Sequence, residues 1–122
     1  MKGRVCRDQA NRRPTIRSVG AGKILDLPSL PTISDGTAGG IEPGAVTFDL
    51  CRELVDDYET VTEDEIKESL QEFLQSQHML IEGAAAVAVA AMVKQRDRLA
   101  GKNVVVIICG ANISLETLKT VL

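Results

Sequence analysis

Five consecutive β-branched residues, Val104-Val105-Val106-Ile107-Ile108, stand near the end of this 122-residue chain. A run of this kind is typical of a strand that is covered on both faces, because a half-exposed strand alternates apolar and polar side chains. Strands of that type lie inside parallel sheets with helices on both sides. The sequence therefore predicts a buried parallel strand over residues 104–108.

The segments on either side of this run have helical patterns. Before it, residues 84–99 begin as an Ala-rich, wholly apolar stretch and become charged in their second half. Small side chains let a helix approach a sheet closely, so we expect a half-buried helix that packs across the strand. After the run, residues 109–112 form an exit loop, and Ser114 is expected to cap a final helix to Leu122.

A capping box predicts another helix. Thr62 is followed at the third helical position by Glu65, so that each side chain can bind the backbone N–H of the other residue. The helix then runs to about Gln77 with apolar residues along one stripe. Upstream, Thr47 is expected to cap a shorter helix that ends at about Leu54.

Residues 57–61 are predicted to form a second, short strand. The resulting order of helix, strand, helix, helix, strand and helix is an α/β pattern with parallel strands. Two parallel strands cannot bury both of their faces, so the sheet is expected to be larger than this chain. The predicted fold class is therefore α/β, a partial parallel sheet flanked by helices, as a fragment of a larger domain.

The composition excludes several classes of function. With no Trp, one Tyr and two Phe, the chain lacks aromatic platforms for single-stranded nucleic acid. Its three Cys are widely spaced and it has one His, which indicates neither a disulfide framework nor a zinc site. The longest apolar run, residues 84–93, is too short to cross a bilayer and is expected to be a buried helix. We expect a cytoplasmic protein with no metal, membrane or nucleic-acid partner.

The first 23 residues carry seven Lys or Arg and a single acid, Asp8. Such a start can be a targeting segment or a nucleic-acid-binding arm, but Pro14 and Asp8 interrupt any amphipathic helix. A solvated basic tail is the simpler interpretation. Binding of nucleic acid by this tail should vanish at physiological salt, because the rest of the chain is acidic. Residues 1–17 are therefore set apart from residues 18–122.

Four stretches, in order, resemble the landmarks of threonine/serine dehydratases, which are pyridoxal phosphate (PLP) enzymes of fold type II. They are a Gly-rich loop at residues 30–44, an acidic block at 54–66, a segment at 79–85 and the strand end at 108–112. The resemblance covers about residue 18 to the C-terminus. It implies that residues 18–122 are the C-terminal part of a PLP-dependent dehydratase domain.

The resemblance implies positions beside the cofactor for five residues. It places Cys109 at the pyridine nitrogen, where a thiol is a weak, neutral donor, unlike a carboxylate that would keep this nitrogen protonated. It places Asp35 and Gly36 beside the substrate and the ring. Gly110 follows Cys109 at the same place, and Glu82 lies near the ring. From the residues alone, alternatives stay open: a small buried cysteine, glycines of a surface turn, and a glutamate that stabilises a helix start.

Other parts of such an enzyme have no match in this sequence. The family holds its cofactor through a Lys in a Ser-x-Phe-Lys-x-Arg-type motif, an Asn after it and a Gly-rich phosphate loop, and no stretch matches any of these. We therefore expect no catalytic residue in this chain and no PLP bound by the chain alone. The acidic cluster at residues 56–65 is interpreted as a solvated face rather than a metal site.

The activity implied by the resemblance is conversion of a small hydroxy amino acid, threonine or serine, to a 2-oxo acid and ammonia. On this interpretation the chain is a truncated ammonia-lyase that is inactive alone. The alternative is a non-catalytic fragment that docks onto a complementary N-terminal piece or associates with itself as a homo-oligomer. If the parental fold is kept, the cofactor-facing residues should share one rim, beyond the carboxyl end of the strand at 104–108.

Overall fold

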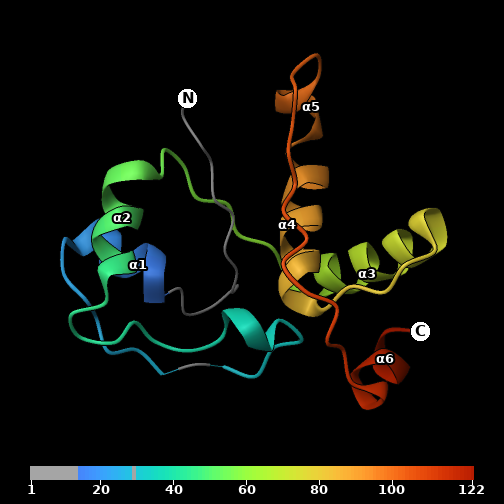
Figure 1. Cartoon of the computed structure of the whole chain (residues 1–122), viewed down its shortest axis with the longest axis horizontal. Coiled ribbons are helices and arrows are strands. Elements are labelled where there is room, and N and C mark those ends of the chain that lie inside the picture. The colour runs from blue at the N-terminus through green and yellow to red at the C-terminus, as the bar shows by residue number, and fades with distance from the viewer. Residues whose placement is uncertain (1–13, 29) are drawn as a thin grey trace.

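The structure is a computed structural model that describes residues 14–28 and 30–122. Its described residues form two groups of helices joined by extended segments (Figure 1). The first two α-helices contact each other, the third and fifth contact the fourth, and the sixth contacts the third. The elements are α1 (Pro14–Ala21), the 3-10 turn η1 (Asp35–Thr37), α2 (Val46–Leu54), α3 (Glu63–Gln77), α4 (Gly83–Lys94), α5 (Arg96–Leu99) and α6 (Leu115–Val121).

Of the basic segment at residues 1–17, residues 1–13 lie outside the described residues, and Pro14 begins α1. Within the described part of the chain, no helix combines the length and the apolar character that crossing a bilayer requires.

Two helices begin where the sequence predicts. The Thr62 hydroxyl accepts the backbone N–H of Glu65 at 3.1 Å, and the Glu65 carboxylate accepts the N–H of Thr62 at 2.6 Å, so the capping box of α3 is confirmed. His78 ends this helix in the left-handed conformation, with φ 55°. At the start of α6, the Ser114 hydroxyl accepts the N–H of Thr117, as expected for a cap residue.

The start of α2 differs from the prediction. Its N-cap is Ala45, which has no capping side chain, and the expected cap residue Thr47 lies inside the helix. The helix itself and its end at Leu54 are confirmed. Phe48 is buried where α2 meets α1. Burial of a large apolar side chain stabilises by about 1.5–3 kcal/mol and outweighs a cap hydrogen bond of about 1 kcal/mol, so packing places this helix.

The main core lies between α3 and α4. Ile66 of α3 is fully buried, and α4 is buried on most sides of its Ala-rich first half, which confirms the expected buried helix. The helix predicted over residues 84–99 is present as α4 and α5, which meet at Gln95. The buried cluster consists of Val61, Ile66, Leu70, Ile81, Ala85, Ala86, Val87, Val89, Ala90, Ala91 and Val121.

Residues 14–28 and 30–122 contain no β-strand, and Val55 is a single bridge residue. Residues 57–61 and 104–108 are extended segments, but none of the hydrogen bonds among the described residues pairs their backbones. The prediction of two parallel strands formed within this chain is therefore wrong for the described residues. A ladder needs a partner strand, and an extended segment alone does not supply one. The larger parallel sheet stays a prediction.

The 104–108 segment returns alongside α4 in Figure 1. Val106 packs against the core, whereas Val105 is 82% exposed and Ile107 is 68% exposed. One face of the segment is thus partly covered, with Val104 43% and Ile108 41% exposed, and the other face is open. This is the geometry of a strand that has a helix on one side and no sheet around it.

Side chains from the end of α4 bind the 57–61 segment. Lys94 Nζ donates to the C=O of Thr60 at 2.8 Å, and the buried Gln95 donates to the carboxylate of Glu59 at 2.8 Å. The segment ends at Val61, which is almost completely buried. These contacts fix the approach of the chain to α3.

Candidate functional site

The carboxylate of Glu82 connects the start of α4 to the loop after the 104–108 segment. Glu82 is the N-cap residue of α4, but its side chain makes no capping hydrogen bond to that helix. Instead, Oε2 accepts the backbone N–H of Asn112 at 3.1 Å. The backbone N–H of Glu82 also donates to the C=O of Gly110 at 3.1 Å. The Glu82 side chain thus binds the exit loop rather than the backbone N–H groups of its own helix.

Gly110 provides the space for this carboxylate. A Cβ atom at Gly110 would lie 2.3 Å from Oε2 and 2.4 Å from Cδ of Glu82, which is much closer than van der Waals contact allows. The glutamate would have to swing away and give up its hydrogen bond from Asn112. A glycine at this position is thus a requirement of the observed geometry.

The Gly-rich loop reaches the same carboxylate from another direction. Gly36 lies in η1, which packs against α4. A Cβ atom at Gly36 would lie 3.7 Å from Oε1 of Glu82 and 3.1 Å from Cβ of Ala84. Of the five residues that the resemblance places beside a cofactor, the structure therefore brings Gly36, Glu82 and Gly110 together.

Asp35 and Cys109 are the chain neighbours of Gly36 and Gly110, and both are exposed. The Asp35 carboxylate accepts the N–H of Gly36 at 2.7 Å, which fixes the turn locally. Cys109 is thus not buried by the described residues, and the alternative of a small buried residue at a strand end stays open. Its position opposite a pyridine nitrogen stays a prediction.

Gly83, for which the sequence suggests no role, allows the turn to approach α4. A Cβ atom at Gly83 would lie 2.1 Å from the carbonyl oxygen of Ile33 and 3.0 Å from Cα of Ser34. These are backbone atoms, which cannot rotate out of the way. A glycine at the first position of an otherwise Ala-rich helix is the signal that could have predicted a close approach, because alanine is favoured there unless space is lacking.

Glu63 holds the same turn from α3. Its Oε2 accepts the backbone N–H of Ile33 at 2.9 Å, and its Oε1 accepts the hydroxyl of Thr32 at 2.5 Å. The interpretation of the acidic cluster at 56–65 as a solvated face is therefore wrong for this residue. The local sequence carries no sign of the contact, since the partners of Glu63 lie about 30 residues earlier in the chain.

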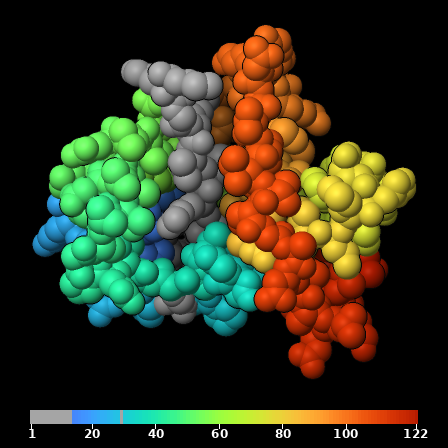
Figure 2. All heavy atoms as spheres, viewed as in Figure 1, coloured from blue at the N-terminus to red at the C-terminus, as the bar shows by residue number. Residues whose placement is uncertain are grey.

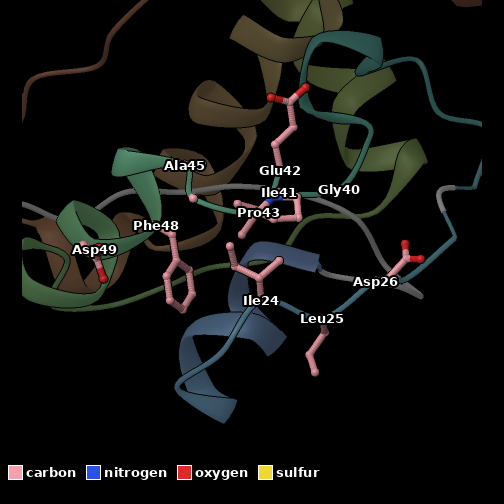
Figure 3. A pocket seen from close by; sticks show the side chains of 11 residues that line it. Ile24, Leu25, Asp26, Gly40, Ile41, Glu42, Pro43, Ala45, Phe48 and Asp49 are labelled. Atoms are coloured by element: carbon pink, nitrogen blue, oxygen red, sulfur yellow. The ribbon is translucent and has the colours of Figure 1, made fainter.

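A separate hollow of about 930 Å³ lies between α1, α2 and the second half of the Gly-rich loop (Figure 3). Ile24 and Phe48 face each other across it, whereas the carboxylate of Glu42 extends away from them. None of the five predicted residues lines this hollow, so it is not the candidate site. Its lining consists of Ile24, Leu25, Asp26, Gly40, Ile41, Glu42, Pro43, Gly44, Ala45, Phe48 and Asp49.

Metal ligands and lysines are two further kinds of group that a cofactor enzyme can use. Residues 14–28 and 30–122 contain no group of three or more His, Cys, Asp and Glu side chains that could hold a metal ion. Lys94 contacts Glu65 at 3.2 Å, at the opposite end of α4 from Glu82. Within the described part of the chain, no lysine forms a hydrogen bond or an ion pair with Glu82.

Comparison with known proteins supports the resemblance. A family model described as "Pyridoxal-phosphate dependent enzyme" matches residues 5–110. The L-threonine ammonia-lyase of Geobacter sulfurreducens is 39% identical over 105 residues, which cover 85% of this chain and 26% of that protein. The serine racemase of Bos taurus is 38% identical over 104 residues, which cover 82% of this chain and 30% of that protein.

Solved structures of related enzymes have a similar fold. The processed form of threonine deaminase isoform 2 from Solanum lycopersicum aligns with a TM-score of 0.82 at 26% identity, over 97% of this chain and 35% of that chain. Serine racemase from Dictyostelium discoideum aligns with a TM-score of 0.77 at 32% identity, over 92% of this chain and 36% of that chain. The chain thus spans little more than a third, or less, of the length of these four relatives.

Proposed function

The chain belongs to the family of pyridoxal-phosphate-dependent enzymes, and from this membership we propose that it forms one wall of the cofactor site of a threonine or serine ammonia-lyase. The observation that carries the proposal is the approach of Gly36 and Gly110 to the carboxylate of Glu82. The name of the relative from Geobacter sulfurreducens, L-threonine ammonia-lyase, supports the reaction class.

The residues around Glu82 fit one side of the cofactor. Gly36 and Gly110 carry no Cβ, so the backbone can approach a flat ring closely, and the thiol of Cys109 is exposed next to Gly110. No lysine of the described residues is bonded to Glu82. These residues therefore fit a part of the site that contacts the cofactor without a covalent bond to it. A lysine that anchors the cofactor and a loop that binds its phosphate would come from residues other than these.

PLP, when bound, supplies an electron sink for the negative charge left on a substrate Cα after it loses a proton. The Cys109 thiol would offer the pyridine nitrogen a weak hydrogen bond without keeping it protonated. A thiol at this position would therefore favour prompt loss of the β-hydroxyl of threonine or serine over chemistry that needs a long-lived carbanion. Glu82 would hold the loops that carry Gly36 and Gly110 at a fixed separation.

In this proposal the 104–108 segment is an interior strand of the parallel sheet of a larger fold type II domain. Residues 18–122 contribute to that domain, and the family match, which begins at residue 5, reaches into the basic N-terminal segment. The exposed side chains of Val105 and Ile107 support this placement, because neighbouring strands and helices would bury them. The chain is then inactive without residues that complete the sheet and anchor the cofactor. Its free thiols, Cys51 and Cys109, favour a reducing cytoplasm.

The second candidate function is a non-catalytic fragment that docks onto a complementary chain or onto itself. The same segment favours it, since an extended apolar stretch with unpaired backbone groups is a template for pairing. The two candidates differ in whether the docked complex binds PLP.

An experiment with the full 122-residue chain tests the proposal. The chain is mixed with PLP and threonine, alone and together with a purified piece of the Geobacter sulfurreducens relative that lacks the matched region. We expect no 2-oxo acid and no borohydride-reducible lysine adduct from the chain alone. With the added piece, we expect a complex that yields both the 2-oxo acid and the lysine adduct. When the chain carries Gly110→Ala, the complex should produce at least about tenfold less 2-oxo acid.

Gly20→Ala is the matched control, because a Cβ at Gly20 meets nothing within 4 Å. This variant should retain the activity of the complex. Threonine turnover by the chain alone would contradict the proposal. A stable complex without any PLP adduct would support the non-catalytic candidate instead.

A further inference from the structure

We propose that Glu63 is the positioning residue of the turn that carries Asp35 and Gly36. The inference deepens the proposed function, on which it rests for the role of that turn beside the cofactor. Glu63 touches neither Gly36 nor Glu82 in any hydrogen bond or ion pair of the described residues, so it acts through the residues that precede the turn.

The carboxylate has a rigid base. Glu63 is the first residue of α3, directly after Thr62, whose capping box with Glu65 fixes the start of the helix. One turn further along, Ile66 is fully buried in the core. A side chain on such a base can hold a loop in one place, because the base itself has little freedom to move.

The hydrogen bonds of Glu63 continue into the turn. The Thr32 hydroxyl, which donates to Glu63, also accepts the backbone N–H of Ser34 at 3.0 Å. Ser34 is completely buried, and its hydroxyl lies 2.6 Å from that of Thr37 at the end of η1. A chain of hydrogen bonds therefore runs from Glu63 through Thr32 and Ser34 to Thr37, and Gly36 lies between the last two residues.

The other backbone polar group of Ile33 is held by packing. The carbonyl group of Ile33 lies against Gly83, where there is no space for a Cβ, while the N–H of Ile33 donates to Glu63. Helices α3 and α4 thus hold Ile33 from two sides. Without the carboxylate, the turn would keep only the contact with α4 and would separate from Glu82 more often.

Amide hydrogen exchange of the full chain, without PLP, tests this role. Glu63→Gln removes the charge, and its NH₂ group can meet Thr32 only by donating to the hydroxyl, so two charge-assisted hydrogen bonds are replaced by weaker neutral ones at best. We expect the amides of residues 33–37 to exchange at least about tenfold faster, in keeping with the strength of a hydrogen bond to a charged group. Thr32→Val, which leaves α3 unchanged, should accelerate the same amides.

Asp64→Asn is the matched control. It removes the same charge one position later in the first turn of α3, and Asp64 is exposed and has no hydrogen bond or ion pair among the described residues. Exchange at residues 33–37 should be unchanged in this variant. Amides within residues 66–74 and 85–91 report the core in the same samples and should keep their wild-type rates.

Two outcomes would overturn the inference. Wild-type exchange of the turn in both Glu63→Gln and Thr32→Val would show that the contacts do not position it. Equal acceleration of the turn and the core would show that Glu63 only supports overall stability. Because the measurement needs no cofactor, failure of the ammonia-lyase proposal would leave its result intact, and the reverse also holds.

Discussion

Single glycines decide how closely the loops of this chain approach its helices. Gly83 faces backbone atoms of Ile33 and Ser34, whereas Gly110 faces the end of the Glu82 side chain. A side chain can rotate away from a new methyl group, but a backbone held by its own packing cannot. Substitution of Gly83 should therefore affect the stability of the fold, and substitution of Gly110 should affect mainly the shape of the candidate site.

Gly83→Ala should lower the free energy of unfolding by about 1–3 kcal/mol, the usual cost of forcing a methyl group into a packed region. Its Cβ would lie 2.1 Å from the Ile33 oxygen, so the backbone must shift. Urea denaturation followed by circular dichroism measures the change. In Gly20→Ala, where the methyl group meets nothing within 4 Å inside α1, stability should stay equal or rise by about 0.5–1 kcal/mol. Equal stability of wild type and Gly83→Ala would refute the close approach.

Among the elements, α3 is the one that links the others. Its start binds the 32–33 loop through Glu63, its middle packs on α4, and Gln71 Nε2 donates to the C=O of Val121 in α6. Glu65 connects the first turn to the end of α4. Burial raises the pKa of the Glu65 carboxyl, but the hydrogen bond from the Thr62 backbone and the hydrogen bond and charge of Lys94 outweigh it, so its pKa lies below the ordinary value of 4.5.

This lowered pKa makes the stability of α3 sensitive to acid. A carboxyl with a lower pKa in the folded than in the unfolded state stabilises the fold above its unfolded pKa, and this contribution is lost as the pH falls through the folded pKa. Above pH 4.5, Glu65→Gln should therefore be less stable than wild type by about 0.2–1 kcal/mol, the typical contribution of a surface ion pair. The difference should shrink toward zero as the pH falls further below 4.5.

Urea denaturation at a series of pH values measures this difference. Glu68→Gln is the control, because Glu68 lies in the same helix and has no hydrogen bond or ion pair among the described residues. The free energy of unfolding of Glu68→Gln should differ little from that of wild type at every pH. A Glu65→Gln difference that stays constant or grows in acid would contradict the expectation.

At the scale of the whole molecule, several large apolar side chains of the described residues are exposed. Figure 2 shows the 104–108 segment on the surface beside α4 rather than beneath other elements. Val105 and Ile107 point outward from it, and Val46 and Leu54 of α2 are 70% and 66% exposed. These exposed apolar side chains support the proposed docking of the chain onto other protein surface. The core between α3 and α4, in contrast, is closely packed and buried. The exposed apolar side chains of the 104–108 segment lie outside this core.

The chain should bind the dye ANS, and Val105→Lys with Ile107→Lys should reduce the fluorescence by about half or more, because charges on the segment oppose apolar contact. The same double variant should sediment with less dependence on protein concentration. Leu115→Lys is the control: this residue is 75% exposed but lies in α6, away from the segment, so its effect should be clearly smaller. Equal effects of the two variants would show that the segment is not the main apolar surface.

Local interactions explain which parts of the fold could be predicted from the sequence. The capping box of Thr62 and Glu65 and the cap at Ser114 are formed by residues three positions apart, so the sequence contains both partners. The buried, Ala-rich first half of α4 follows from composition in the same way. The motifs around Gly36, Glu82 and Gly110 identified the candidate site, because the resemblance depends on residue types in order.

The tertiary structure decided everything that depends on distant partners. The contact of Glu63 with the 32–33 loop and the fit of Gly83 against Ile33 join residues about 30 to 50 positions apart, and no periodicity encodes them. The 104–108 segment also shows that distant partners decide the structure. Its β-branched side chains favour an extended backbone, which the chain adopts, but a strand exists only when neighbours accept its hydrogen bonds, and the described residues do not provide them.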